Sequence, residues 1–102
     1  MSTQLDVVID EKIKQINHLP SKYNVVMLND DKTPIDWVIS VLTEIFKHSD
    51  ATAESLTMDI HNKGSAVVGT YSYEIAEQKA LETINLSRSN GFPLQVKVDE
   101  EK

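Results

Sequence analysis

Residues 33–46 carry the pattern that most constrains the fold, because they read as an amphipathic helix with a clearly marked start. Thr33 is a preferred N-cap residue and Pro34 suits the first helical position. Asp36 follows three residues after Thr33, where a carboxylate favours the helix N-terminus. A single apolar stripe then runs along the predicted helix: Ile35, Val38, Ile39, Leu42, Ile45 and Phe46. Such a stripe has to be buried against a second layer of structure.

The rest of the chain alternates between strand and helix patterns. A short apolar, β-branched run predicts a strand at residues 23–28, and later strands are expected at residues 66–71 and 94–98. A second helix is expected from Ser49 or Asp50 to just before Gly64, with one face formed by Ala53, Leu56, Thr57, Ile60 and His61. Ser72 can cap a third helix that runs from about Tyr73 to Arg88 and stops at Asn90-Gly91. The element order is βααβαβ, which predicts an α+β two-layer sandwich with three helices on a small three-stranded antiparallel sheet.

An N-terminal leader, residues 1–22, precedes this body, residues 23–102. It places Leu5, Val8, Ile9, Ile13 and Ile16 at helical spacing before a break near Pro20. Two interpretations stay open from this spacing. The leader is either a first helix packed on the core or a mobile segment that becomes ordered on a partner.

Length and composition limit the classes of function. A chain of 102 residues has room for one domain, and its 40% apolar and 25% charged residues are ordinary for a globular protein. The formal net charge of −6 disfavours binding to nucleic acid or to anionic membranes. The chain has no cysteine, no apolar run long enough to span a membrane and no basic start typical of a signal peptide. We therefore expect a cytoplasmic protein.

Three features exceed what folding requires, namely the polar turn Asn29-Asp30-Asp31, its junction with the helix start at Thr33-Pro34-Ile35, and His61 on an apolar helix face. Each also has a structural explanation. An Asn-Asp-Asp turn commonly satisfies its own backbone, and a partly buried histidine commonly bonds a backbone carbonyl.

Catalysis and metal binding find little support in the sequence. His18 and His48 do not stand at ligand spacing from His61, so we expect no metal and no other cofactor. Ser65 and Ser72 lie in turn or cap contexts without a nucleophile elbow, and three glycines form no phosphate loop. We therefore expect a binding module and not an enzyme.

Three segments together resemble the ClpS family of small adaptors. Residues 23–34 match its strand followed by Asn-Asp-Asp-x-Thr-Pro, and residues 58–64 match its His-x-x-Gly element. Gly69-Thr70-Tyr71 followed by residues 74–79 is similar to the start of its third helix. The resemblance covers roughly residues 20 to 98, in order and with similar spacings.

The resemblance implies a function and assigns residues to it. ClpS adaptors bind the free α-ammonium and the bulky first side chain (Leu, Phe, Tyr or Trp) of N-degron substrates and deliver them to a ClpAP-type protease. By that resemblance Asn29, Asp30, Asp31 and His61 bind the α-ammonium. The side-chain pocket is expected to use Thr33, Pro34, Ile35, Val38, Thr57, Ile60 and Leu94, together with His61. Ile35 and Thr57 stand where the family commonly has Met, so the preference among first residues stays open.

The resemblance also implies partners. Glu74 and Lys79 match positions that contact the N-terminal domain of a ClpA- or ClpC-type unfoldase, although a solvated helix face would look the same in the sequence. The leader would be a mobile extension, and the protein a monomer in the cytoplasm or the plastid stroma. Two alternatives have to be separated from this account. One is a structural interaction module with the topology of the ribosomal stalk C-terminal domain, and the other is an acid–base or metal-dependent enzyme using Asp30, Asp31 and His61.

Overall fold

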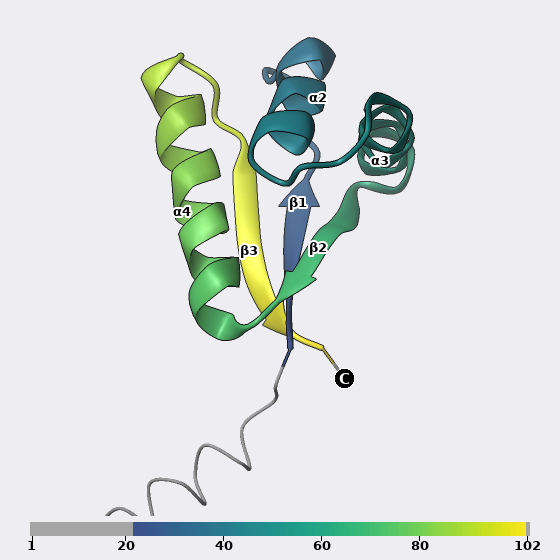
Figure 1. Ribbon diagram of the computed structural model, residues 1–102. Coiled ribbons are helices and arrows are strands. Elements are labelled where there is room, and N and C mark those ends of the chain that lie inside the picture. Colours follow the sequence, from purple (N-terminus) through teal and green to yellow (C-terminus); the bar gives the residue numbers. More distant parts are fainter. Residues whose placement is uncertain (1–21, 102) are drawn as a thin grey trace, which may run out of the picture.

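The computed structural model describes residues 22–101, so the expectations for the leader lie outside the described residues. The elements are β1 (Tyr23–Leu28), α2 (Ile35–Glu44), α3 (Asp50–Lys63), β2 (Ser65–Tyr71), α4 (Tyr73–Ser89) and β3 (Gln95–Glu100) (Figure 1). The predicted order βααβαβ and the α+β class are confirmed. No helix within residues 22–101 has the length and apolar character needed to cross a membrane.

β1 is the central strand of a three-stranded sheet of order β2-β1-β3, and both of its neighbours are antiparallel to it. Val25 and Met27 on β1 are completely buried, while the residues between and beside them are partly exposed. Val98 and Val96 of β3 stand opposite these two residues and point to the same face. This alternation identifies the face of the sheet that the helices cover.

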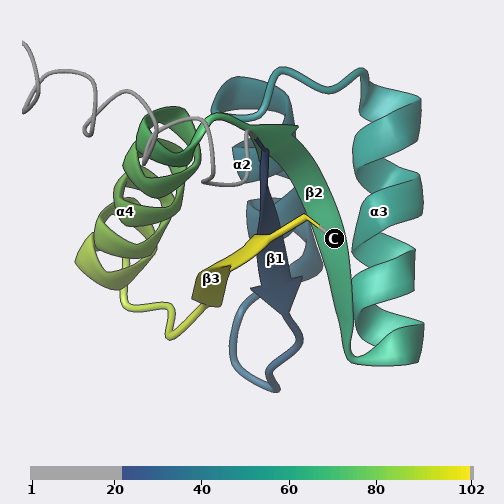
Figure 2. The same cartoon turned by 90° about the horizontal axis from the view of Figure 1, so that it is seen from below.

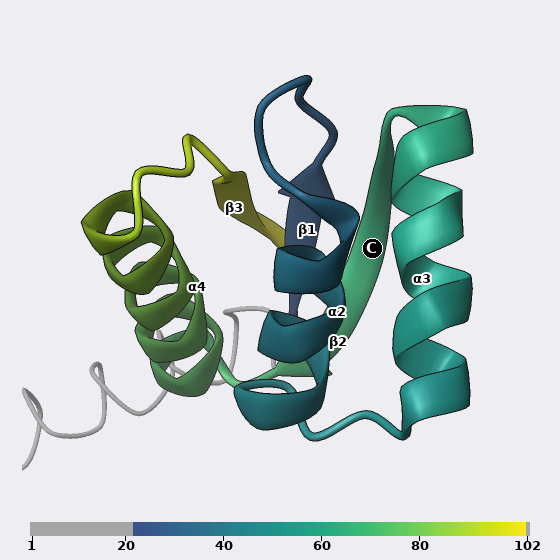
Figure 3. The same ribbon diagram turned by 90° about the horizontal axis from the view of Figure 1, so that it is seen from above.

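The three helices lie side by side in the order α4, α2, α3 (Figures 2 and 3). α2 is joined to α4 by the Trp37 indole N–H, which donates to the Ser87 hydroxyl over 2.8 Å. The connection from α2 to α3 is fixed to the sheet, because Nε2 of His48 hydrogen-bonds the Val68 carbonyl. The first bond holds α2 against α4, and the second holds the connection between α2 and α3 against β2.

The start of α2 differs from the prediction by one residue. Pro34 and not Thr33 is the N-cap, and the Pro34 carbonyl accepts from the N–H groups of Trp37 and Val38. The Thr33 hydroxyl donates instead to the Asp30 carboxylate over 2.7 Å. Because the Thr33 N–H donates to Asp30 as well, Thr33 belongs to the turn that Asp30 organises, and the helix begins one residue later.

Both ends of α3 follow the prediction. The Ser49 hydroxyl accepts from the N–H of Thr52 over 3.2 Å and so caps the first turn. Gly64 ends the helix with φ of 91°, a left-handed conformation that strongly favours glycine. The helix therefore ends at Lys63, two residues after His61, and β2 begins at Ser65.

Candidate functional site

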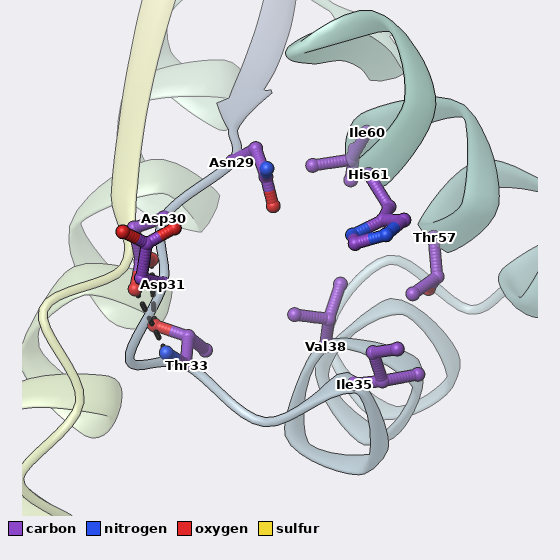
Figure 4. Close-up of a pocket in the computed structure, with 9 residues that line it drawn as sticks. All are labelled: Asn29, Asp30, Asp31, Thr33, Ile35, Val38, Thr57, Ile60 and His61. Carbon is purple, nitrogen blue, oxygen red and sulfur yellow. Dashed lines mark hydrogen bonds between the residues drawn. The ribbon is translucent and has the colours of Figure 1, made fainter.

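A pocket of about 290 Å³ opens between the turn after β1, the start of α2 and the second half of α3. All nine residues that line it were predicted site residues: Asn29, Asp30, Asp31, Thr33, Ile35, Val38, Thr57, Ile60 and His61 (Figure 4). Three segments far apart in the sequence therefore converge on one cavity. Its volume is at the lower end of ligand pockets, so it suits one side chain better than a large ligand.

The turn that carries the polar residues is fixed to the far wall of the pocket. The Asn29 backbone N–H donates to the Gly64 carbonyl over 2.9 Å, which ties the turn to the end of α3. The Asn29 side-chain amide and the His61 ring consequently point into the same space from opposite sides (Figure 4). The sequence marked Gly64 only as a helix end and gave no signal for this second role of its carbonyl.

Asp30 organises the turn. Its Oδ1 accepts from the backbone N–H groups of Lys32 and Thr33, each over 2.8 Å, and its Oδ2 accepts from the Thr33 hydroxyl over 2.7 Å. An ionised carboxylate can accept about four hydrogen bonds. One acceptor position, on Oδ2, is therefore not used by the turn.

The same contacts explain the ionisation of Asp30. Partial burial alone would raise its pKa, but the Thr33 hydroxyl, the two backbone N–H groups and the nearby Lys32 charge together outweigh it. The net effect holds the pKa of Asp30 below its usual value of 3.8. Asp30 is an anion at neutral pH, and the pocket has a fixed negative charge at this end.

The opposite end of the pocket is apolar. Val38 and Ile60 are almost fully buried, and Ile35, which is 47% exposed, stands at the mouth. Thr57 is buried as well, and its hydroxyl donates to the Ala53 carbonyl over 2.7 Å. Because the hydroxyl proton is used inside α3, Thr57 is a less polar wall residue than its side-chain type suggests.

His61 is exposed but lines the pocket together with Thr57 and Ile60, and its ring has no hydrogen-bond partner within residues 22–101. The sequence allowed a partly buried histidine that bonds a backbone carbonyl, and in the structure it is His48 that makes such a bond. Among the described residues, no three His, Cys, Asp or Glu side chains are grouped so that they could hold a metal ion. His61 is thus available to a ligand in the pocket.

Two predicted pocket residues do not line this cavity. Pro34 shapes the start of α2 as its N-cap, and its ring is not part of the wall. Leu94 is 1% exposed and borders a different hollow, together with Leu28 and the first residues of β3. β3 pairs with β1 on the side away from β2, which places Leu94 across β1 from α3.

The two predicted unfoldase contacts differ in their surroundings. Glu74 is exposed in the first turn of α4. Lys79 is half-buried, and its ammonium donates to the Ile45 carbonyl over 2.8 Å at the end of α2. The ammonium also lies 5.4 Å from the centre of the Tyr71 ring. Lys79 therefore stabilises the end of α2 and is not a freely solvated side chain.

Comparison with known proteins matches residues 18–97 to the family model described as ATP-dependent Clp protease adaptor protein ClpS. The chain belongs to the ClpS family. A ClpS adapter protein from Treponema denticola is 41% identical over 97 residues, covering 95% of this chain and 92% of the relative. One from Bdellovibrio bacteriovorus is 39% identical over 82 residues, covering 80% of this chain and 72% of the relative.

A solved structure supports the same assignment. Agrobacterium tumefaciens ClpS2 bound to L-phenylalaninamide is 41% identical and superimposes with a TM-score of 0.78, covering 81% of this chain and all of that chain. ClpS proteins are adaptors of the ATP-dependent Clp protease. The alternative of a structural module similar to the ribosomal stalk domain is disfavoured, because the pocket bordered by Asn29, Asp30 and His61 is present and the family match includes it.

Proposed function

We propose that the pocket binds the first residue of a protein substrate and that the chain delivers this substrate to a ClpAP-type protease. The observation that carries the proposal is the division of one cavity into a polar end with a fixed negative charge and a buried apolar end. The first residue of a protein has the same two parts, an α-ammonium and a side chain, joined at one carbon atom.

The polar end supplies acceptors that suit an α-ammonium, which has three N–H donors and a positive charge. Asn29 offers its side-chain oxygen, Asp30 offers the unused acceptor position on Oδ2, and neutral His61 offers a ring nitrogen. Asp31 lines the same end and adds negative charge. An acetylated N-terminus has neither the charge nor the three donors, so it should not bind.

The apolar end is suited to a bulky hydrophobic side chain such as that of Leu, Phe, Tyr or Trp. Burying one such side chain contributes about 1.5 to 3 kcal/mol, and one hydrogen bond to a charged group contributes about 1.5 to 3 kcal/mol. Micromolar affinity needs about 8 kcal/mol. Binding should therefore require the amine and the side chain together.

The ligand of the Agrobacterium tumefaciens relative agrees with this division. L-phenylalaninamide has a free α-amino group, a benzyl side chain and an amide in place of the first peptide bond. The superposition covers 81% of this chain, and the two proteins are 41% identical. These likenesses support a similar ligand class here.

For delivery we propose contact between α4 and the N-terminal domain of a ClpA- or ClpC-type unfoldase, with the protein acting as a cytoplasmic monomer. Exposed Glu74 is suited to a direct contact. Lys79 is proposed to contribute as well, although its ammonium is already bonded to the end of α2.

Fluorescence anisotropy with short labelled peptides tests the proposed function. Peptides that begin with free Leu, Phe, Tyr or Trp should bind saturably, and their N-acetylated versions should not. Peptides that begin with Ser or Gly control for binding of the amine alone. Equal affinity of the free and acetylated peptides would rule the proposal out.

A further inference from the structure

A second hollow, of about 320 Å³, lies between β3 and α4 and has no place in the function proposed above. Its floor is apolar, and it is lined by Leu28, Ile84, Arg88, Leu94, Gln95, Val96 and Lys97. Leu94 is 1% exposed, so the bottom of the hollow is part of the core. β3 is an edge strand, because the sheet order β2-β1-β3 pairs it with β1 alone (Figure 1).

Two cationic side chains line this hollow in a protein with a formal net charge of −6. Within residues 22–101 the Arg88 guanidinium has no carboxylate at ion-pair distance. Lys97 pairs with Asp99 over 3.4 Å, but both side chains are more than half exposed. An exposed pair of this kind is worth little, so Lys97 can exchange Asp99 for another carboxylate.

A further apolar residue of α4 lies on the same side of the helix as the two α4 residues that line the hollow. Leu81, Ile84 and Arg88 follow each other at i, i+3 and i+7, which places them on one side of the helix. Leu81 is 50% exposed although it is apolar. Extended peptides can add a strand to an exposed sheet edge, where pockets take their alternate side chains.

We propose that this hollow and the adjoining edge of β3 at residues 95–97 bind an extended, acidic segment of a partner protein. An apolar side chain of the segment enters the hollow, and a neighbouring carboxylate bonds Arg88 and Lys97. Charge complementarity at the hollow selects this occupant, since a basic segment would meet two cations and an uncharged one would leave the Arg88 guanidinium without a carboxylate. Arginine in particular can hold a carboxylate through two parallel hydrogen bonds.

The test uses the full chain, labelled with ¹⁵N, and a peptide of about eight residues in which Val or Leu alternates with Glu. The peptide is N-acetylated and C-amidated, so it lacks the α-ammonium that the first pocket is proposed to need. We expect saturable shifts of the backbone amides of Leu28, Arg88 and residues 95–97. A matched peptide with Lys in place of Glu should cause none.

Charge reversal tests the role of the two cations. The double variant Arg88→Glu, Lys97→Glu should lower the affinity for the acidic peptide about tenfold. The double variant Lys22→Glu, Lys63→Glu makes the same change in net charge at exposed positions outside the hollow and should change the affinity much less. If charge reversal disturbs the amide spectrum of the free protein, Arg88→Gln, Lys97→Gln replaces it.

Three results would overturn the inference. The acidic peptide could fail to cause saturable shifts, the two double variants could weaken binding equally, or the shifts could map to residues 29–31 and 57–61. The last result would assign the peptide to the first pocket. The outcome is independent of the proposed function, because the acetylated peptide does not test recognition of a free N-terminus.

Discussion

Replacing Asp30 by Asn should separate the two tasks of this carboxylate. The carboxylate organises the turn through three hydrogen bonds and leaves one acceptor position on Oδ2 for an α-ammonium. In Asp30→Asn, the amide oxygen can still accept from the N–H groups of Lys32 and Thr33, and the Thr33 hydroxyl can rotate to accept from the new NH₂ group. The turn should persist, but the negative charge is gone.

The expected loss of substrate affinity follows from the lost charge. A hydrogen bond to a charged group contributes about 1.5 to 3 kcal/mol, which corresponds to about 10- to 150-fold in affinity. The free energy of unfolding should fall by only about 1 to 2 kcal/mol, because the bonds within the turn become neutral but are kept. Fluorescence anisotropy with a Phe-initiated peptide measures the first quantity, and urea denaturation measures the second.

Asp36→Asn is the matched control for Asp30→Asn. Asp36 is an exposed carboxylate in the first turn of α2 and does not line the pocket, so its replacement makes the same change in net charge. We expect its peptide affinity to stay within about twofold of the unaltered protein, because solvent and salt screen exposed charges. The reasoning is refuted if Asp30→Asn binds normally, or if both variants lose affinity equally.

Three further predictions concern ligand binding, protonation and packing. His61→Ala removes a ring acceptor from the pocket and should weaken binding of a Phe-initiated peptide in anisotropy titrations without unfolding the domain, and unchanged binding would contradict the role of His61. The folded-state pKa of Asp30 lies below its usual value of 3.8, so Asp30 stabilises the fold above that pH, and this contribution is lost as the pH falls through the folded-state value. Thr33→Val removes the hydroxyl that helps to lower the pKa of Asp30. In urea denaturation, the free energy of unfolding of this variant should depend less on pH between about 5 and 2, and an unaltered pH profile would contradict this role of Thr33. Ser87→Ala leaves the Trp37 indole N–H without its acceptor. The variant should lose about 1 to 3 kcal/mol of unfolding free energy and keep its peptide affinity, whereas a loss of affinity would show that this contact shapes the pocket.

The elements and one whole pocket wall could be predicted from the sequence because local patterns determine them. Helical spacing placed Val38 on α2 and Thr57, Ile60 and His61 on one side of α3. Gly64 marked the end of α3, since few other residues adopt its left-handed conformation readily. With the turn added by family resemblance, these residues met in one cavity.

Features that depend on competition or on distant contacts could not be predicted in this way. The Thr33 hydroxyl could accept from an N–H group at the helix start or donate to the Asp30 carboxylate, and the sequence alone does not show which bond forms. Lys79 looked like a surface residue, because nothing local indicates that the end of α2 lies beside it. Leu94 was assigned to the first pocket, but the strand pairing places it at the second hollow.

The central claim is that one pocket recognises the α-ammonium and the first side chain together, and calorimetry with two small ligands tests it most directly. L-phenylalaninamide and 3-phenylpropanamide differ only by the α-amino group. The account predicts that L-phenylalaninamide binds at least about 100-fold more tightly, because two or more hydrogen bonds to a charged group are lost without the amine. Equal affinities for the two ligands would contradict it.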